Sequence, residues 1–209
     1  MSATPLTPEL IETASKISTA TLHEAAGRIG ALPSAIKPTH PDFKICGPAF
    51  TILAPGGDNL WLHRALYEAT PGDILVMSAG DVYEYGYWGE ILSTAAVQQK
   101  LGGLVINAGV RDSDLLPEVG FPVFANRLCI RGTIKDPHAN GRMGVPLLME
   151  GIRIMPGDLI VGDNDGIVCL PAADVPEIIE ASLARDEKEA GIMERIRAGE
   201  RTLDIFGLE

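Results

Sequence analysis

Short apolar runs and longer amphipathic stretches follow one another along the chain, and this pattern predicts alternating strands and helices. Apolar runs bounded by proline, glycine or polar residues are typical of buried strands, whereas apolar positions three or four residues apart indicate helices. We expect strands at residues 45–53, 74–76, 104–106, 121–124, 129–133, 145–149, 152–154, 159–161 and 167–170. Helices are expected to begin at residue 8, near residues 18, 60 and 88–90, and at residue 175.

Local signals mark the start of the first helix and the end of the last one. Thr7 precedes Pro8 and Glu9, so a capping hydroxyl is followed by the proline and the acid that favour a first helical turn. The last helix is expected over residues 175–198, with a wide polar face and Gly199 at its end. Such a helix packs one stripe on its own domain, and it could also reach a neighbouring subunit.

The stretch from Gly86 to Asp114 combines two features that favour a ligand site. A helix opens at Gly89-Glu90, where backbone N–H groups without helical partners could hold an anion. The next strand, residues 104–106, runs into Asn107-Ala108-Gly109, where glycine lets the backbone make a tight turn or come close to a ligand.

A cation and carboxylates follow this predicted turn directly, as Arg111, Asp112 and Asp114. The end of a buried strand is where layered α/β proteins usually bind their ligands. The alternative is that Arg111 and Asp112 form a surface salt bridge, which is the commoner role of such a pair and contributes little to stability.

Composition narrows the classes of function. With 209 residues and 46% hydrophobic content, the chain can bury a full core as one domain, residues 1–209. No apolar run approaches the ~20 residues of a membrane helix, and the N-terminus lacks a signal-peptide pattern, so we expect a cytoplasmic protein with no membrane partner. The net charge of −11 argues against a nucleic-acid partner. An anionic substrate therefore needs local positive charge, such as Arg111 or a metal ion.

Most familiar catalytic motifs are absent from the sequence. It contains no P-loop, no dinucleotide-binding glycine motif, no HExxH and no GxSxG. None of the six lysines has a convincing apolar setting, which disfavours a Schiff-base mechanism, and the three cysteines are expected to be reduced and mostly buried. His63 on its predicted helix is interpreted as structural. What remains is a metal-assisted or electrostatic site built on Asp112 and Arg111.

Several phrases of the sequence together resemble the HMG/CHA aldolases. These are class II pyruvate aldolases that act on 4-hydroxy-4-methyl-2-oxoglutarate and 4-carboxy-4-hydroxy-2-oxoadipate, and they share their fold with the regulator of ribonuclease E activity A. The phrases that carry the resemblance are GYWGEIL, GGLVINAGVRDSD, LPEVGFPVFA, RGTIKD, PGDLIVGDNDGIV and AGERTLDIFGL. The resemblance implies an α/β sandwich like the phosphohistidine swivelling domain, assembled as homotrimers or homohexamers with sites at subunit interfaces.

The resemblance also implies roles for individual residues. Asp112 matches the ligand of Mg²⁺ or Mn²⁺, and Arg111 matches the residue that contacts the pyruvyl oxygen. Glu90 matches an acid that orients metal-bound water. The substrate carboxylate is expected at the backbone of the loop formed by Gly89, Glu90, Ile91 and Leu92, where isoleucine replaces the more common leucine.

Two further acids follow from the resemblance. Glu24 resembles a family acid near the site, and an acid from a neighbouring subunit's C-terminal helix is expected, for which Glu189 is our choice and Glu187 the alternative.

The implied reaction cleaves a 4-hydroxy-2-oxo di- or tricarboxylic acid to pyruvate and a second oxo acid. The metal ion and Arg111 stabilise the enolate, and a metal-linked water or hydroxide takes the proton of the C4 hydroxyl.

Two rival functions remain open at this point. One is a non-catalytic regulator that binds a protein, which would not need a metal-binding aspartate. The other is a dedicated oxaloacetate decarboxylase, because loss of carbon dioxide from oxaloacetate gives the same enolate. The sequence leaves the substituent at C4 undetermined.

Overall fold

The computed structural model describes residues 6–208. Its helices are α1 (Pro8–Ala14), α2 (Thr19–Ala25), α3 (Leu60–Glu68), α4 (Glu90–Gln98), α5 (Leu116–Val119), α6 (Val175–Arg197) and α7 (Thr202–Phe206). Its strands are β1 (Lys37–Pro38), β2 (Ile45–Leu53), β3 (Ile74–Ser78), β4 (Gly86–Trp88), β5 (Gly103–Val110), β6 (Val123–Leu128), β7 (Arg142–Met143), β8 (Leu147–Met149), β9 (Ile152–Ile154), β10 (Leu159–Gly162) and β11 (Ile167–Leu170). The α/β class expected from the sequence is confirmed.

One mixed sheet organises the fold. Its strands lie in the order β1-β6-β5-β3-β2-β10-β11, with β4 added beside β5 and β7 beside β2. The neighbours β2, β3, β5 and β6 are parallel, whereas β10 and β11 are antiparallel. The sheet is nearly closed, because Ala31, just ahead of β1, bridges Val168 on β11.

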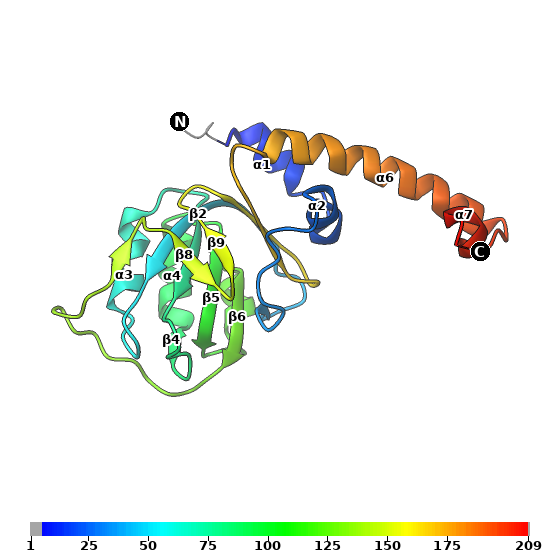
Figure 1. Ribbon diagram of the computed structural model, residues 1–209. Coiled ribbons are helices and arrows are strands. Elements are labelled where there is room, and N and C mark those ends of the chain that lie inside the picture. The colour runs from blue at the N-terminus through cyan, green and yellow to red at the C-terminus, as the bar shows by residue number, and fades with distance from the viewer. Residues whose placement is uncertain (1–5, 209) are drawn as a thin grey trace.

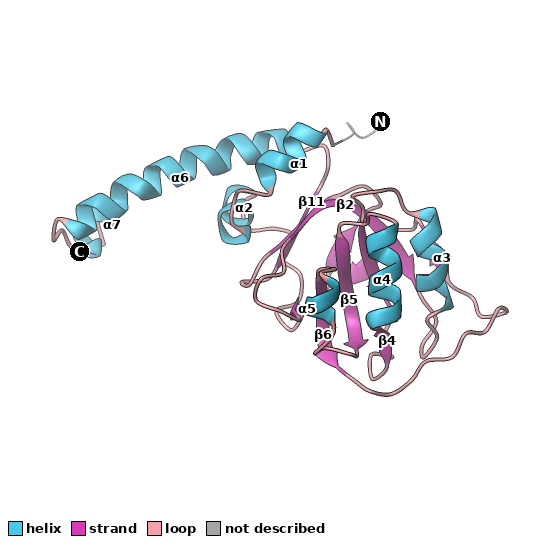
Figure 2. Ribbon diagram, turned by 180° about the vertical axis from the view of Figure 1, so that it is seen from behind, coloured by secondary structure: helices cyan, strands magenta, loops and turns pink. Residues whose placement is uncertain are grey.

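Helices α3, α4 and α5 cover one face of the parallel strands (Figure 2). Helix α4 buries Leu92, Ser93 and Ala96 against the sheet. The indole of Trp88, directly before this helix, stacks on Phe121 and donates a hydrogen bond to Ser93 Oγ over 2.7 Å. The start of α4, which carries the predicted anion site, is therefore held on the main hydrophobic core.

A second, smaller core joins α1, α2 and the start of α6 to β10 and β11. Thr7 caps α1 as the sequence predicts, its hydroxyl accepting from Leu10 N. In α6 the buried residues are confined to the first turns, Val175 to Ser182. Beyond them α6 extends away from the sheet, and α7 folds back at its far end (Figure 1).

Two local predictions are wrong, and both concern the approach to the candidate site. Residues 107–109 are part of β5, so the predicted tight turn does not exist. Between Ile106 and Gly109 the register of β5 against β6 shifts, which is a β-bulge that redirects the strand before Arg111. Residues 129–133 form no named strand, and Ile130 is 95% exposed.

Of the helices in the described part of the chain, none is long and apolar enough to cross a membrane.

Candidate active site

Arg111 and Asp112 lie directly after β5, beside the start of α4. Arg111 N donates to Trp88 O over 2.9 Å, which ties the end of β5 to the residue before Gly89. Asp112 has a left-handed backbone (φ 59°), a conformation that aspartate tolerates better than most residues. Its carbonyl accepts from Leu115 N and Leu116 N, so the chain turns sharply and directs this aspartate back toward α4.

Asp112 and the start of α4 are in direct contact. Glu90 N donates to Asp112 Oδ2 over 3.1 Å, and Arg111 Nε lies 3.7 Å from the same oxygen. Gly89 makes this approach possible, since a Cβ at that position would lie 2.2 Å from Asp112 Oδ2. The N–H groups of Ile91 and Leu92, which follow in the first turn, have no hydrogen-bond partner in the described structure.

A pocket of about 160 Å³ opens over these groups. One part of its lining is formed by Gly89, Ile91, Leu92, Arg111 and Asp112, and a second part, called the second wall below, is formed by Asn59, His63 and Lys135. Arg111 and Lys135 carry positive charge and Asp112 is an acid, so the pocket can attract an anion although the whole chain is acidic.

The second wall is held together by contacts between two segments that are distant in the sequence. Asn59 N donates to Ile134 O over 3.1 Å, and Ile134 N donates to Gly57 O over 2.9 Å. The buried carboxylate of Asp58 accepts from Asp136 N over 2.6 Å. Lys135, which lies between Ile134 and Asp136, is therefore fixed next to the start of α3.

Asn59 and His63 stand one helical turn apart on α3. The amide of Asn59 donates to Tyr87 O over 2.9 Å, while its buried Oδ1 has no hydrogen-bond partner among the described residues. Burial lowers the pKa of His63 below its ordinary value, and the positive charge of Lys135 lowers it further. The imidazole is therefore neutral near pH 7.

Sequence reasoning missed this wall. His63 is interpreted there as structural, and neither Asn59 nor Lys135 is assigned a role. The phrase RGTIKD, which contains Lys135, was a usable signal, because it is one of the phrases that carry the family resemblance.

The predicted site residues divide into two groups. Arg111, Asp112 and the backbone of residues 89–92 come together as expected. The side chain of Glu90 is exposed and lies outside the residues that line the pocket, and so does Asp114.

Glu24 and Glu189 lie together on another part of the chain. Arg185 Nη1 is 3.8 Å from Glu24 Oε2, and Arg185 Nε is 2.8 Å from Glu189 Oε1. Arg28 Nε also contacts the Glu24 carboxylate, and these partners lower the pKa of Glu24. Neither glutamate lines the pocket of its own chain.

The residues present fit a divalent cation that is held mainly by water and ligand oxygens. Nowhere in residues 6–208 do three His, Cys, Asp or Glu side chains gather into a metal site, which excludes an all-protein cage there. Mg²⁺ characteristically uses one or two carboxylates and keeps several waters. Asp112, with the space that Gly89 leaves beside its Oδ2, provides such a carboxylate.

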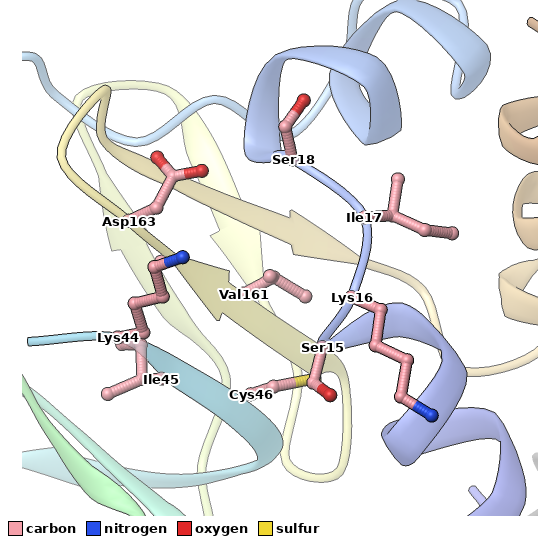
Figure 3. A pocket seen from close by; sticks show the side chains of 10 residues that line it. Ser15, Lys16, Ile17, Ser18, Lys44, Ile45, Cys46, Val161 and Asp163 are labelled. Carbon is pink, nitrogen blue, oxygen red and sulfur yellow. The ribbon is translucent and has the colours of Figure 1, made fainter. Parts of the chain in front are cut away.

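A larger cavity, of about 390 Å³, lies between the α1–α2 connection and strands β2 and β10 (Figure 3). Asp163 there accepts from the backbone and hydroxyl of Thr19 and from Asp165 N. Burial raises the pKa of the Cys46 thiol to about 12, so this cysteine is a poor nucleophile. The carboxylate of Asp163 stabilises the fold through these hydrogen bonds. The smaller pocket, which contains Arg111 and Asp112, has the better catalytic groups.

Comparison with known proteins identifies the family of the chain. The RraA-like family, described as Aldolase/RraA, matches residues 8–169. A protein of Halalkalibacterium halodurans named "Putative 4-hydroxy-4-methyl-2-oxoglutarate aldolase" is 31% identical over 186 residues, which cover 87% of this chain and 88% of that protein.

Solved structures share the fold. An uncharacterized protein from Pseudomonas syringae pv. tomato superposes with a TM-score of 0.83 at 26% identity, covering 96% of this chain and 94% of that one. The RNA-processing inhibitor RraA from Thermus thermophilis superposes with a TM-score of 0.67 at 26% identity, covering 74% of this chain and 92% of that one. The chain therefore belongs to the Aldolase/RraA family, whose members include both proteins named as aldolases and RraA regulators.

Proposed function

We propose that the protein is a divalent-metal-dependent pyruvate aldolase, a carbon–carbon lyase. The observation that carries this proposal is the contact of the Asp112 carboxylate with the first turn of α4, in a pocket that also holds Arg111. A regulator that only binds proteins has no need of a carboxylate and a guanidinium gathered in a pocket of this size. The naming of related proteins as aldolases supports the same choice.

The residues of the pocket can each take one part of the reaction. The N–H groups of Ile91 and Leu92 bind the substrate carboxylate at the positive end of α4. Arg111 donates to the 2-oxo oxygen, where negative charge develops as the enolate forms. Asp112 would hold Mg²⁺ or Mn²⁺, and the bound ion would supply Lewis-acid stabilisation of the same enolate.

The substrate class is taken from the family resemblance, and this arrangement suits it. A 4-hydroxy-2-oxo di- or tricarboxylic acid would give pyruvate and a second oxo acid, either pyruvate or oxaloacetate. Oxaloacetate would lose carbon dioxide through the same enolate, so decarboxylation is expected as a side activity. The anionic substrate suits a pocket that contains Arg111 and Lys135.

The metal requirement gives the first test of this function. We expect pyruvate to be released from both aldol substrates, or from one of them, and from oxaloacetate. Excess EDTA should stop both reactions, and Mg²⁺ or Mn²⁺ should restore them, because one carboxylate holds the ion only moderately. A coupled lactate dehydrogenase assay measures the pyruvate. Full turnover in EDTA, or trapping of the substrate on a lysine by borohydride, would contradict the metal mechanism.

We also propose that the protein is a homotrimer or homohexamer. The distal part of α6 and the α7 segment expose six large apolar side chains: Leu183, Met193, Ile196, Leu203, Phe206 and Leu208. An isolated helix in water is only marginally stable, so an apolar surface of this kind favours contact with another subunit. In such an assembly Glu24 and Glu189, which Arg185 holds together, would complete a neighbour's pocket.

A complementation experiment tests whether sites are shared between subunits. Co-expressed Asp112→Asn and Glu189→Gln chains should form mixed oligomers in which some pockets carry an intact Asp112 and an intact neighbouring Glu189. We therefore expect activity well above that of either variant alone. Light scattering reports the oligomeric state, and separately purified variants mixed without subunit exchange are the control. A fully active monomer of 22.2 kDa would overturn the proposal.

A further inference from the structure

The cleavage reaction needs a proton acceptor at a defined place. When the bond between C3 and C4 breaks, the hydroxyl on C4 must lose its proton as its oxygen becomes a carbonyl oxygen. The acceptor must lie within hydrogen-bond reach of that hydroxyl. A substrate bound in this pocket of about 160 Å³ lies against the side chains that line it. The acceptor can therefore be sought among the side chains that line the pocket.

Most polar groups of the pocket are unsuited to this role. Asp112 already accepts from Glu90 N and would hold the cation. The hydroxyl of Tyr87 accepts from Gly57 N and donates to Val82 O, and burial raises its pKa. Arg111 and Lys135 are cations that can only donate. Asn59 Oδ1 can accept a hydrogen bond but is too weak a base to take a proton.

His63 is the remaining candidate among the side chains that this chain itself contributes to the pocket. It is one of the residues that line the pocket, and its imidazole makes no hydrogen bond among the described residues. The charged residues that line the same pocket are Lys135, Arg111 and Asp112. Burial and Lys135 lower its pKa, which keeps a ring nitrogen unprotonated and able to accept at neutral pH.

We infer that His63 is the general base that takes the proton of the C4 hydroxyl; the inference rests on the proposed aldolase function. The hydroxyl proton passes to a ring nitrogen of His63, and the O–H electron pair forms the new C4 carbonyl. The C3–C4 bond breaks, and its electron pair passes to the pyruvyl fragment as an enolate. The enolate then takes a proton at C3 from solvent to give pyruvate, and the imidazolium gives its proton to solvent, so atoms and charge balance. This step assigns to a side chain of the pocket the proton transfer that the family resemblance gives to a metal-linked water.

The two reactions of the pocket make this inference testable. Retro-aldol cleavage requires removal of a hydroxyl proton, whereas oxaloacetate decarboxylation has no such proton to remove. We expect His63→Gln to lower the rate of cleavage by about a hundredfold or more, the usual contribution of a general base. Decarboxylation by the same variant should stay within about threefold of wild type. His40→Gln, which changes a histidine outside this pocket, is the matched control.

A second variant protects the test against poor folding of the first. His63→Ala should show the same selective loss, and added imidazole should partly restore cleavage by occupying the space of the missing ring.

Replacing Lys135 with methionine removes a charge that lowers the pKa of His63. The acid limb of the cleavage pH profile should therefore move to higher pH in Lys135→Met.

The experiment measures both reactions for wild type, His63→Gln, His63→Ala and His40→Gln, each with a melting curve. A loss restricted to cleavage, together with rescue by imidazole, is the expected result. An equal loss of both reactions, or no loss of either, would overturn the role of His63 while leaving the aldolase function in place. If the wild-type protein itself fails to release pyruvate from any of the substrates, the proposed function fails, and the role of His63 fails with it.

Discussion

Asp112→Asn should lose both retro-aldol cleavage and oxaloacetate decarboxylation, each by roughly a hundred- to a thousandfold or more. Both reactions pass through the same enolate, and asparagine removes the negative charge that would hold the cation. Asparagine is preferred to alanine because it tolerates the left-handed backbone of this residue (φ 59°). Steady-state rates with saturating Mg²⁺ measure the loss.

The melting curve of this variant distinguishes loss of chemistry from loss of folding. Asp112 is on the surface, with 36% of its side chain exposed, and such substitutions usually change the free energy of unfolding by less than about 0.5 kcal/mol. The melting temperature should therefore stay within about 2 °C of wild type. If Asp112→Asn keeps wild-type rates, the loop that contains Asp112 has a purely structural role. Loss of activity through unfolding alone would assign Asp112 to the scaffold and favour the regulator function.

Gly89→Ala is the second change with a large expected effect. The backbone of Gly89 is extended, so alanine is allowed there, but its Cβ would lie 2.2 Å from Asp112 Oδ2. The carboxylate is the end of a flexible side chain and can move aside at little cost in stability. A displacement of about 1 Å at a catalytic group can lower the rate about a hundredfold, and we expect a loss of this order.

A matched glycine variant provides the control for this prediction. Gly132 lies in the loop after β6, and a Cβ there would meet no atom within 4 Å. Gly132→Ala should therefore keep its activity. Gly89→Ala should also bind Mg²⁺ or Mn²⁺ more weakly, because the moved carboxylate is the proposed ligand. Its residual activity should therefore need a higher metal concentration. Wild-type activity of Gly89→Ala would show that the position of Asp112 is not critical.

Much of the fold could be predicted from the sequence because its signals are local. Strand β2 (Ile45–Leu53) and strand β9 (Ile152–Ile154) were predicted with their observed bounds, and α1 begins as its capping signal indicates. The contact between Arg111-Asp112 and the start of α4 was also predictable, because both belong to phrases of the family resemblance.

The errors arise where the reason for a residue type is a long-range contact. The sequence indicates a turn, or a close approach to a ligand, at Gly109, yet this residue lies within β5, where a Cβ would meet Tyr85 O at 2.6 Å. The glycine is needed for this close approach of another segment. Residues 129–133 suggested a strand because they include apolar side chains, but Ile130 is exposed in this chain.

The pattern of apolar residues could not predict the second wall, formed by Asn59, His63 and Lys135, for a similar reason, and only the phrase RGTIKD pointed to Lys135. Asn59 and Lys135 are far apart in the sequence and are brought together by backbone hydrogen bonds between segments 57–59 and 134–136. No periodicity of apolar residues signals such a contact. The roles of Glu24 and Glu189 stay predictions, because they depend on a neighbouring subunit.

The central claim is that this pocket stabilises the enolate of pyruvate, and it can be tested without knowing the substituent at C4. Proton NMR in deuterium oxide follows the exchange of the methyl protons of pyruvate, which requires formation of the enolate. With Mg²⁺, we predict that the wild-type protein will exchange these protons at least about a hundredfold faster than Asp112→Asn, and that EDTA will remove the difference. Equal exchange rates for wild type, Asp112→Asn and buffer alone would contradict the claim.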